Sequence, residues 1–143
     1  MKFWDTSALV PLLVHEAATK AMRARFAADP IVLVAWTTPV ECASAIARAE
    51  QDGLLTRGEA GAAFSRLDEL ATLWREVEPS NDVRDIARRL LRVHRLRAAD
   101  VVQLASAILA ADRRPASLNM VTLDDRLAKA AGKEGFVIVG SDA

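Results

Sequence analysis

The sequence of 143 residues contains a single cysteine, Cys42, which excludes an intramolecular disulfide. A lone thiol, with no basic-then-apolar leader before the first strand-like residues, predicts a cytoplasmic protein in a reducing compartment. No apolar run approaches the ~20 residues that a membrane-spanning helix needs, because charged residues interrupt every apolar stretch. We therefore expect no membrane contact.

Net charge is also absent, since 19 Lys and Arg balance 19 Asp and Glu. Global charge therefore gives no reason to expect a nucleic-acid partner, which usually selects a basic surface. The local distribution differs from the average. Residues 84–97 contain six arginines and His94 against one acid, Asp85.

Internal repeats, low-complexity tracts and Gly/Ser/Pro linkers are absent as well. With 52% apolar and 27% charged residues, the composition is that of an ordinary globular domain. At this length about 70% of the unfolded chain's surface can be buried, so folding requires no metal or disulfide. We expect residues 1–143 to form a single domain.

Short apolar segments alternate with longer amphipathic ones, which predicts a three-layer α/β fold. The sheet is expected to be mostly parallel, with four to five strands flanked by helices and a helical hairpin at about 38–74. The expected strands are residues 2–5, 31–34, 75–78, 120–123 and 136–139. The expected helices are residues 7–14, 16–28, 38–53, 56–74, 80–95, 98–111 and 125–131.

Three segments carry the capping-box pattern, in which a hydroxyl residue is followed three positions later by an acid. These pairs are Thr38 with Glu41, Thr56 with Glu59, and Thr122 with Asp125. Each pattern predicts the start of a helix.

Four acids occupy related positions in the predicted fold. Asp5 and Asp124 follow strands at a strand-to-helix turn, and Glu41 and Asp100 lie in first helical turns. The carboxyl ends of parallel strands share one edge, where reactive groups gather. Asp100 is the only charge in its apolar helix, which we expect to be largely buried, so this carboxylate needs a partner.

Each acid has a structural alternative. Acids in first helical turns serve as caps and dipole partners worth ~0.5–2 kcal/mol. Glu41 fits a capping box, Asp124 fits a simple N-cap, and Asp5 could brace the turn into Ser7. Caps do not explain acids at two strand ends together with a lone charge in an apolar helix.

Convergence of these acids would imply a divalent cation, because like charges in a dehydrated pocket stay ionised only when neutralised. Hard carboxylate oxygens without a histidine or thiolate set select Mg²⁺ or Mn²⁺ over Zn²⁺. The hydroxyls of Thr6, Ser7 and Thr122 are candidate donors to the acids or to coordinated water, and turn stabilisation is the alternative role.

Four segments in this order resemble the PIN-domain ribonucleases and, among them, the VapC toxins of type II toxin–antitoxin systems. The segments are DTSALVPLL at 5–13, TPVECASAI at 38–46, LRAADVVQLASAI at 96–108 and VTLDDRLAKAA at 121–131. The family's acidic quartet falls on Asp5, Glu41, Asp100 and Asp124, and its hydroxyl after the first acid falls on Thr6. Two features depart from the pattern or leave it open: Ala99 stands where many relatives carry an aromatic residue, and Asp125 is a neighbouring candidate for the fourth ligand.

The resemblance implies Mg²⁺- or Mn²⁺-dependent endonucleolytic cleavage of RNA that leaves a 5′-phosphate and a 3′-hydroxyl. Asp5, Asp100 and Asp124 would bind metal, while Glu41 would bind metal or orient the attacking water. It also implies a homodimer and a cognate VapB-type antitoxin. Trp36, Trp74 and the helical hairpin are candidate antitoxin contacts, with core packing as the alternative.

Because the predicted site is negative, RNA would need flanking cations. Arg97, immediately before the Asp100 helix, is the first candidate, followed by Arg95 and Arg92. Their helical spacing also fits a solvated stripe.

Three other functions fit parts of the sequence. A phosphatase forming an aspartyl-phosphate on Asp5 lacks its usual second acid, because position 7 is serine. A free-standing RNA-processing PIN nuclease and a degenerate, non-catalytic PIN interaction module share the fold.

Overall fold

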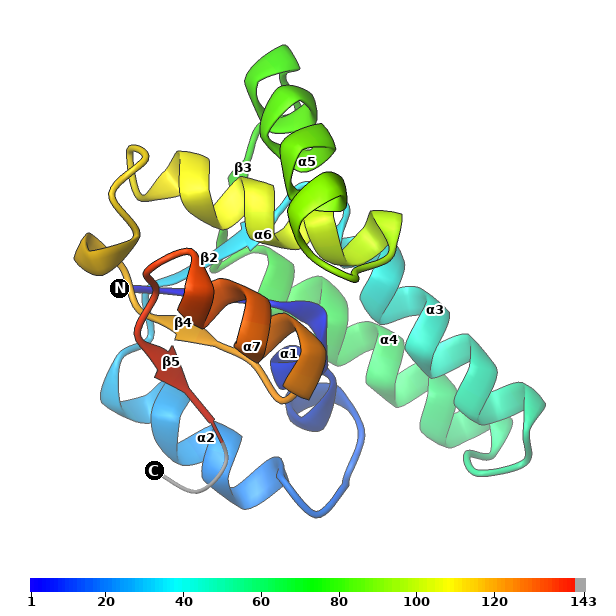
Figure 1. The fold of residues 1–143 in the computed structure, drawn as a ribbon. Helices are drawn as coiled ribbons and strands as arrows, with labels where there is room; N and C mark the ends of the chain where they lie inside the picture. Colours follow the sequence, from blue (N-terminus) through cyan, green and yellow to red (C-terminus); the bar gives the residue numbers. More distant parts are fainter. Residues whose placement is uncertain (141–143) are drawn as a thin grey trace.

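Figure 1 shows the computed structural model, which describes residues 1–140. Within this range five parallel strands form one sheet in the order β3-β2-β1-β4-β5. The strands are β1 (Lys2–Trp4), β2 (Val32–Ala35), β3 (Arg75–Val77), β4 (Met120–Val121) and β5 (Ile138–Val139). The predicted parallel α/β sheet is confirmed.

Helices cover both faces of this sheet. On one face lie α1 (Thr6–Leu13), α2 (Thr19–Ala28), α3 (Thr38–Gln51) and α4 (Arg57–Ala71). On the other lie α5 (Asn81–Val93), α6 (Ala98–Ala110) and α7 (Asp125–Lys133), with a short 3₁₀ helix, η1 (Pro115–Ser117), before β4. Helices α3 and α4 form the predicted hairpin, which extends to one side of the domain (Figure 1).

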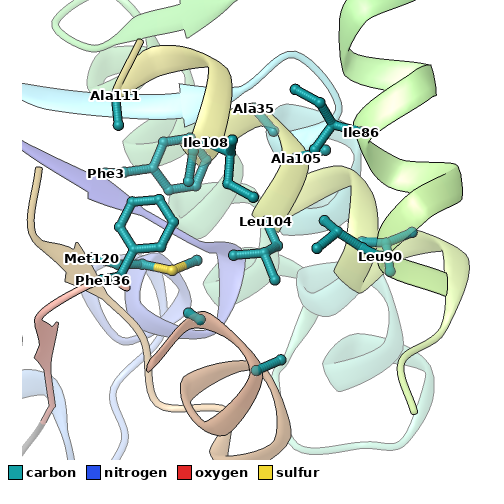
Figure 2. Close-up of a cluster of buried hydrophobic side chains, with 14 of the residues drawn as sticks. Phe3, Ala35, Ile86, Leu90, Leu104, Ala105, Ile108, Ala111, Met120 and Phe136 are labelled. Atoms are coloured by element: carbon teal, nitrogen blue, oxygen red, sulfur yellow. The ribbon is translucent and has the colours of Figure 1, made fainter. Parts of the chain in front are cut away.

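Successive strand residues point to opposite faces, as the pleat requires, and both faces are apolar. Phe3 packs with the α5–α6–α7 side, whereas the adjacent Trp4 packs with the α1–α4 side, and neither side chain is exposed. Met120 and Val121 of β4 divide in the same way. Figure 2 shows the hydrophobic cluster on the α5–α6–α7 side, where Leu104 of α6 lies among side chains from the sheet and neighbouring helices. Burial on both faces explains why the inner strands β1, β2 and β4 are largely apolar, whereas the exposed edge strand β3 carries Arg75 and Glu76.

Strand β1 is central, and the chain leaves it in two directions. β2 and β3 follow on one side, and the chain then returns to place β4 and β5 on the other. The strand order therefore reverses between β1 and β4. In open α/β sheets, ligands bind at such a switch point, beyond the carboxyl ends of the strands.

Several element boundaries differ from those predicted. Helix α2 begins at Thr19 rather than residue 16. The Thr19 hydroxyl donates to the Pro11 carbonyl at 2.7 Å and accepts from the Glu16 N–H at 2.9 Å. These two bonds hold the residues before Thr19 in a loop. The basic helix α5 ends at Val93 instead of about residue 95. Strands β4 and β5 are two residues each.

One of the three predicted capping boxes is confirmed. Thr56 accepts from the Glu59 N–H at 3.1 Å, and Glu59 accepts from the Thr56 N–H at 2.9 Å. The Thr38 box is wrong, because Thr37 is the N-cap residue, without a side-chain cap bond, and the Glu41 carboxylate bonds to other elements.

The Thr122–Asp125 box is also wrong. Asp124 caps α7 by accepting from the N–H groups of Arg126 at 2.9 Å and Leu127 at 3.1 Å. Asp125 is the exposed first residue of the helix.

No helix in the described part of the chain combines the length and apolar character needed to cross a membrane.

Of the two tryptophans considered as antitoxin contacts, Trp74 is a core residue with 7% exposure, whereas Trp36 is 54% exposed.

Truncating the core side chain at Leu104, which is fully buried, removes contacts that the sheet and α5 cannot replace. We expect Leu104→Ala to lower the free energy of unfolding by about 2–5 kcal/mol, measured by urea denaturation. Leu54→Ala is the matched control, because Leu54 is 77% exposed and the same change there should stay within about 0.5 kcal/mol. Equal losses in the two variants would contradict this account of the core.

Candidate functional site

The turn from β1 into α1 forms the centre of the site. Asp5, only 5% exposed, ends the central strand and caps α1, accepting from the Ser7 N–H at 3.3 Å. The Ser7 hydroxyl donates to the other Asp5 oxygen at 2.8 Å. These bonds hold a carboxylate at the carboxyl end of the sheet, where an apolar strand gives way to a helix N-terminus.

Ser7 also joins this turn to the end of β4. Its Oγ lies 3.3 Å from the Thr122 Oγ1 and accepts from the Leu123 N–H at 2.9 Å. Thr122 in turn accepts from the Asp124 N–H at 3.1 Å. A continuous chain of hydrogen bonds thus connects the two acids that follow β1 and β4.

Thr6 joins the same turn to α3 and α6. Its hydroxyl donates to Glu41 Oε2 at 3.2 Å and accepts from the Gln103 amide at 3.3 Å. The buried Gln103 amide also donates to Thr38 at 3.1 Å and directly to Glu41 Oε2. Glu41 Oε2 also accepts from Thr37, the N-cap residue of its own helix, at 3.3 Å. Glu41 is therefore held by two distant side chains, Thr6 and Gln103, and by one local bond.

Asp100 lies at the open side of the site. It is partly exposed rather than buried, contrary to the expectation from its apolar helix, because the first turn of α6 emerges from the core that covers residues 101–108. Its carboxylate accepts from the Arg97 N–H at 3.3 Å. Asp100 and Asp124 line one hollow of about 500 Å³, together with Arg97, Asp125 and Arg126.

Neighbouring acids affect one another's ionisation. Burial raises the pKa of Asp5 from 3.8 to about 6, against the lowering effect of the Ser7 and Thr122 hydrogen bonds, and Asp124 adds to the rise. Burial and Asp100 likewise raise the pKa of Glu41, opposed by its hydrogen bonds from Gln103, Thr6 and Thr37. The four predicted acids therefore interact pairwise along one edge of the sheet.

The donor set at this edge fits a hard divalent cation. It consists of carboxylate and hydroxyl oxygens, which are the ligands that Mg²⁺ and Mn²⁺ prefer. Burial raises the pKa of the adjacent Cys42 thiol to about 12. Within residues 1–140, however, no three His, Cys, Asp or Glu side chains lie close enough to hold one ion as they stand. A cation shared by more than two of these acids therefore requires the side chains to draw together on binding.

The remaining predicted residues fall in different places. Arg97 borders the hollow that contains Asp100 and Asp124, and Arg95 lines an adjoining groove. Arg92 lies farther away, on an exposed surface of α5 with Arg88 and Leu91.

Sequence reasoning missed Gln103 and Thr37, which both bond Glu41. Gln103 had a detectable signal. It is the one long polar side chain inside an apolar helix, three residues after Asp100 and therefore on the same helical face.

The raised pKa of Asp5 has a consequence for stability without metal. The folded state resists ionisation of this carboxyl, so stability falls as pH rises from about 4 through about 6 and stays lower above that. The difference between 3.8 and about 6 corresponds to about 3 kcal/mol as an upper bound.

We expect Asp5→Asn to remove this penalty and to stabilise the metal-free protein at pH 8, with little gain at pH 4. Thermal unfolding in EDTA at both pH values measures the effect. A variant less stable than wild type at pH 8 would show that the hydrogen bonds of the carboxylate outweigh its desolvation.

Comparison with known proteins shows what this chain is similar to. The PIN domain family model matches residues 2–133. Two curated relatives, Ribonuclease VapC45 and Ribonuclease VapC49 from two strains of Mycobacterium tuberculosis, are each 32% identical over 110 residues, covering 77% of this chain and 76% of theirs.

Solved structures share the fold. A toxin–antitoxin complex from Klebsiella pneumoniae contains a chain that superposes with a TM-score of 0.68 at 17% identity, covering 99% of this chain and 98% of that one. FitAcB from Neisseria gonorrhoeae superposes with a TM-score of 0.67 at 19% identity, covering 99% and 98% of the two chains. Nearly the whole described sheet and its helices are thus shared, and this chain belongs to the PIN-domain family.

Proposed function

We propose that this chain is a Mg²⁺- or Mn²⁺-dependent endoribonuclease that acts as the toxin of a type II toxin–antitoxin system. The observation that carries the proposal is the hydrogen-bonded turn at residues 5–7, which connects acids from β1, α3 and the end of β4 at the switch point of a PIN-domain sheet. The relatives named as VapC ribonucleases support RNA as the substrate.

In this proposal Asp5, Asp100 and Asp124 hold the cation. Asp124 is suited to this because both of its cap bonds end on Oδ1, which leaves Oδ2 without a hydrogen bond in the described residues. A bound divalent ion would lower the pKa of a coordinated water and offset negative charge on the phosphate. Glu41, fixed through Oε2 by Gln103, Thr6 and Thr37, has its other oxygen for the ion or for orienting the attacking water.

The hydroxyl residues act by positioning these acids. Ser7 keeps Asp5 in its capping position and also contacts the Thr122 hydroxyl. Thr6 holds Glu41 against α1. A charged phosphodiester reaching this edge meets acids on several sides, so the cation and the flanking Arg97 and Arg95 would have to supply the attraction, with Arg92 contributing from farther along α5.

The proposed partners and location are those that the similarity to VapC ribonucleases implies. We assign to the chain a cognate VapB-type antitoxin, homodimer formation and a cytoplasmic location, with residues 1–143 as one domain. Support comes from the toxin–antitoxin complex among the similar structures and from the exposed Trp36, an aromatic side chain available to a partner.

We expect Asp5→Asn, Asp100→Asn and Asp124→Asn each to reduce Mg²⁺-dependent RNA cleavage by at least about 100-fold and to abolish growth arrest on expression. Asp68→Asn, on the exposed face of α4, is the matched control. Asp125→Asn should keep most of the activity, because Asp125 is exposed and takes no part in the hydrogen bonds of the site.

Three results would redirect the proposal. Wild-type cleavage that persists in EDTA would exclude the metal mechanism. Cleavage without growth arrest would favour a free-standing RNA-processing nuclease. A folded wild-type protein that neither cleaves RNA nor binds Mg²⁺ or Mn²⁺ in calorimetry would favour a non-catalytic interaction module.

Arg97 is tested through the salt dependence of RNA binding. We expect Arg97→Ala to weaken binding of a single-stranded RNA and to reduce the slope of log K against log salt by about 0.7, as loss of one phosphate contact does. Arg57→Ala, exposed at the start of α4, serves as the control. An unchanged slope in Arg97→Ala would remove Arg97 from the RNA path.

A further inference from the structure

A basic groove lies beside the acidic hollow, between the α5–α6 connection and α7. It has a volume of about 580 Å³. His94 and Arg95 line one wall, and Arg126, Lys129 and Lys133 of α7 line the other. The acidic residues of the proposed active site do not extend into it.

The three α7 cations follow the helical repeat. Residues 126, 129 and 133 lie at positions i, i+3 and i+7, which share one helical face. All three are exposed, while Leu127, Ala130 and Ala131 of the same helix are buried against the core. The rise of an α-helix places the first and last of these residues about 10 Å apart along the axis, so the row can contact more than one group of an extended polyanion.

These cations are not neutralised by protein carboxylates. In the part of the chain that the structure describes, none of Arg95, Arg126, Lys129 and Lys133 forms an ion pair. The nearby carboxylate, Glu134, is engaged elsewhere.

Two other residues hold Glu134. Its oxygens lie 2.8 Å from the His94 Nε2 and 2.7 Å from the Arg89 guanidinium, whose hydrogen bond lowers the Glu134 pKa. This ion pair also joins the end of α5 to the end of α7, so it fixes the two walls of the groove relative to each other. The cations facing the groove keep their charge for a ligand.

Arg126 connects the groove to the proposed active site. It lines both the groove and the hollow that contains Asp100 and Asp124. A polyanion that occupies the groove is therefore led to the acids. In the proposed function the group that must reach those acids is a phosphodiester, so the cations beside them are placed to hold the rest of the same RNA chain.

We propose that Arg126, Lys129 and Lys133, with Arg95 on the opposite wall, form a track that binds the RNA backbone and directs it to the acidic edge. This inference rests on the proposed function and names residues on α7 as the substrate contact. The contact is to phosphate, so it is independent of base sequence.

The test compares two double variants that each remove two positive charges. Lys129→Gln/Lys133→Gln removes two of the four cations of the track, and Lys20→Gln/Arg23→Gln removes two exposed cations from α2, on the other face of the sheet. Binding of a fluorescent single-stranded RNA is measured by anisotropy in EDTA, which prevents metal-dependent cleavage, at about 50–200 mM KCl.

We expect the α7 variant to lose roughly tenfold in affinity near 0.1 M salt and about 0.7 in salt slope for each phosphate contact removed, with the α2 variant close to wild type. Equal losses in both variants would assign the effect to net charge and overturn the track. Unchanged binding in the α7 variant would overturn it too. Displacement of the RNA by poly-glutamate at lower concentration than by unlabelled RNA would instead assign the groove to an acidic protein segment.

Failure of the track can be distinguished from failure of the proposed function. If wild type cleaves RNA with Mg²⁺ and the α7 variant binds RNA normally, the track is wrong and the nuclease stands. If wild type never cleaves RNA but the α7 variant loses binding as expected, the track stands and the nuclease is wrong.

Discussion

Two adjacent hydroxyl groups, on Thr6 and Ser7, join carboxylates that lie far apart in the sequence. Ser7 bonds Asp5 and, through Thr122, reaches the backbone of Asp124. Thr6 bonds Glu41 and receives the Gln103 amide from α6. Because each hydroxyl both donates and accepts, one short turn can organise acids from opposite sides of the central strand.

This arrangement works against stability in the absence of a cation. The hydrogen bonds to Asp5 do not compensate for its burial, and its pKa therefore lies well above the ordinary value. Carboxylates whose burial lowers the stability of the metal-free protein, and whose charge a bound cation would offset, are typical of functional sites. The apolar layers on both faces of the sheet supply the stability that the acidic edge lacks.

Charge is segregated over a short distance. The protein has no net charge, yet the acids occupy the carboxyl edge of the sheet and a row of cations begins at Arg126, in the helix that Asp124 caps. A neutral overall composition therefore coexists with adjacent negative and positive surfaces. This local pattern, rather than the net charge, bears on the choice of a polyanionic ligand.

Local sequence patterns predicted features whose partners are close in the chain. The apolar strands, the amphipathic helices, the hairpin and the Thr56 capping box all depend on neighbours within a few residues. The same reasoning failed for the boxes at Thr38 and Thr122, whose hydroxyls bond to Gln103 and Ser7 from other elements instead. A local pattern does not reveal a competing tertiary partner.

The sequence by itself determined that a parallel sheet would be buried on both faces and that acids would follow its strands, because periodicity and strand-end position are written in consecutive residues. Only the tertiary structure decided that Gln103 would hold Glu41 at a separation of 62 positions in the sequence. It also decided that Asp100 would lie partly in solvent and that Lys129 and Lys133 would line a groove with Arg95. These relations depend on how helices pack on the sheet, and packing is set by the shapes of side chains that are distant in sequence.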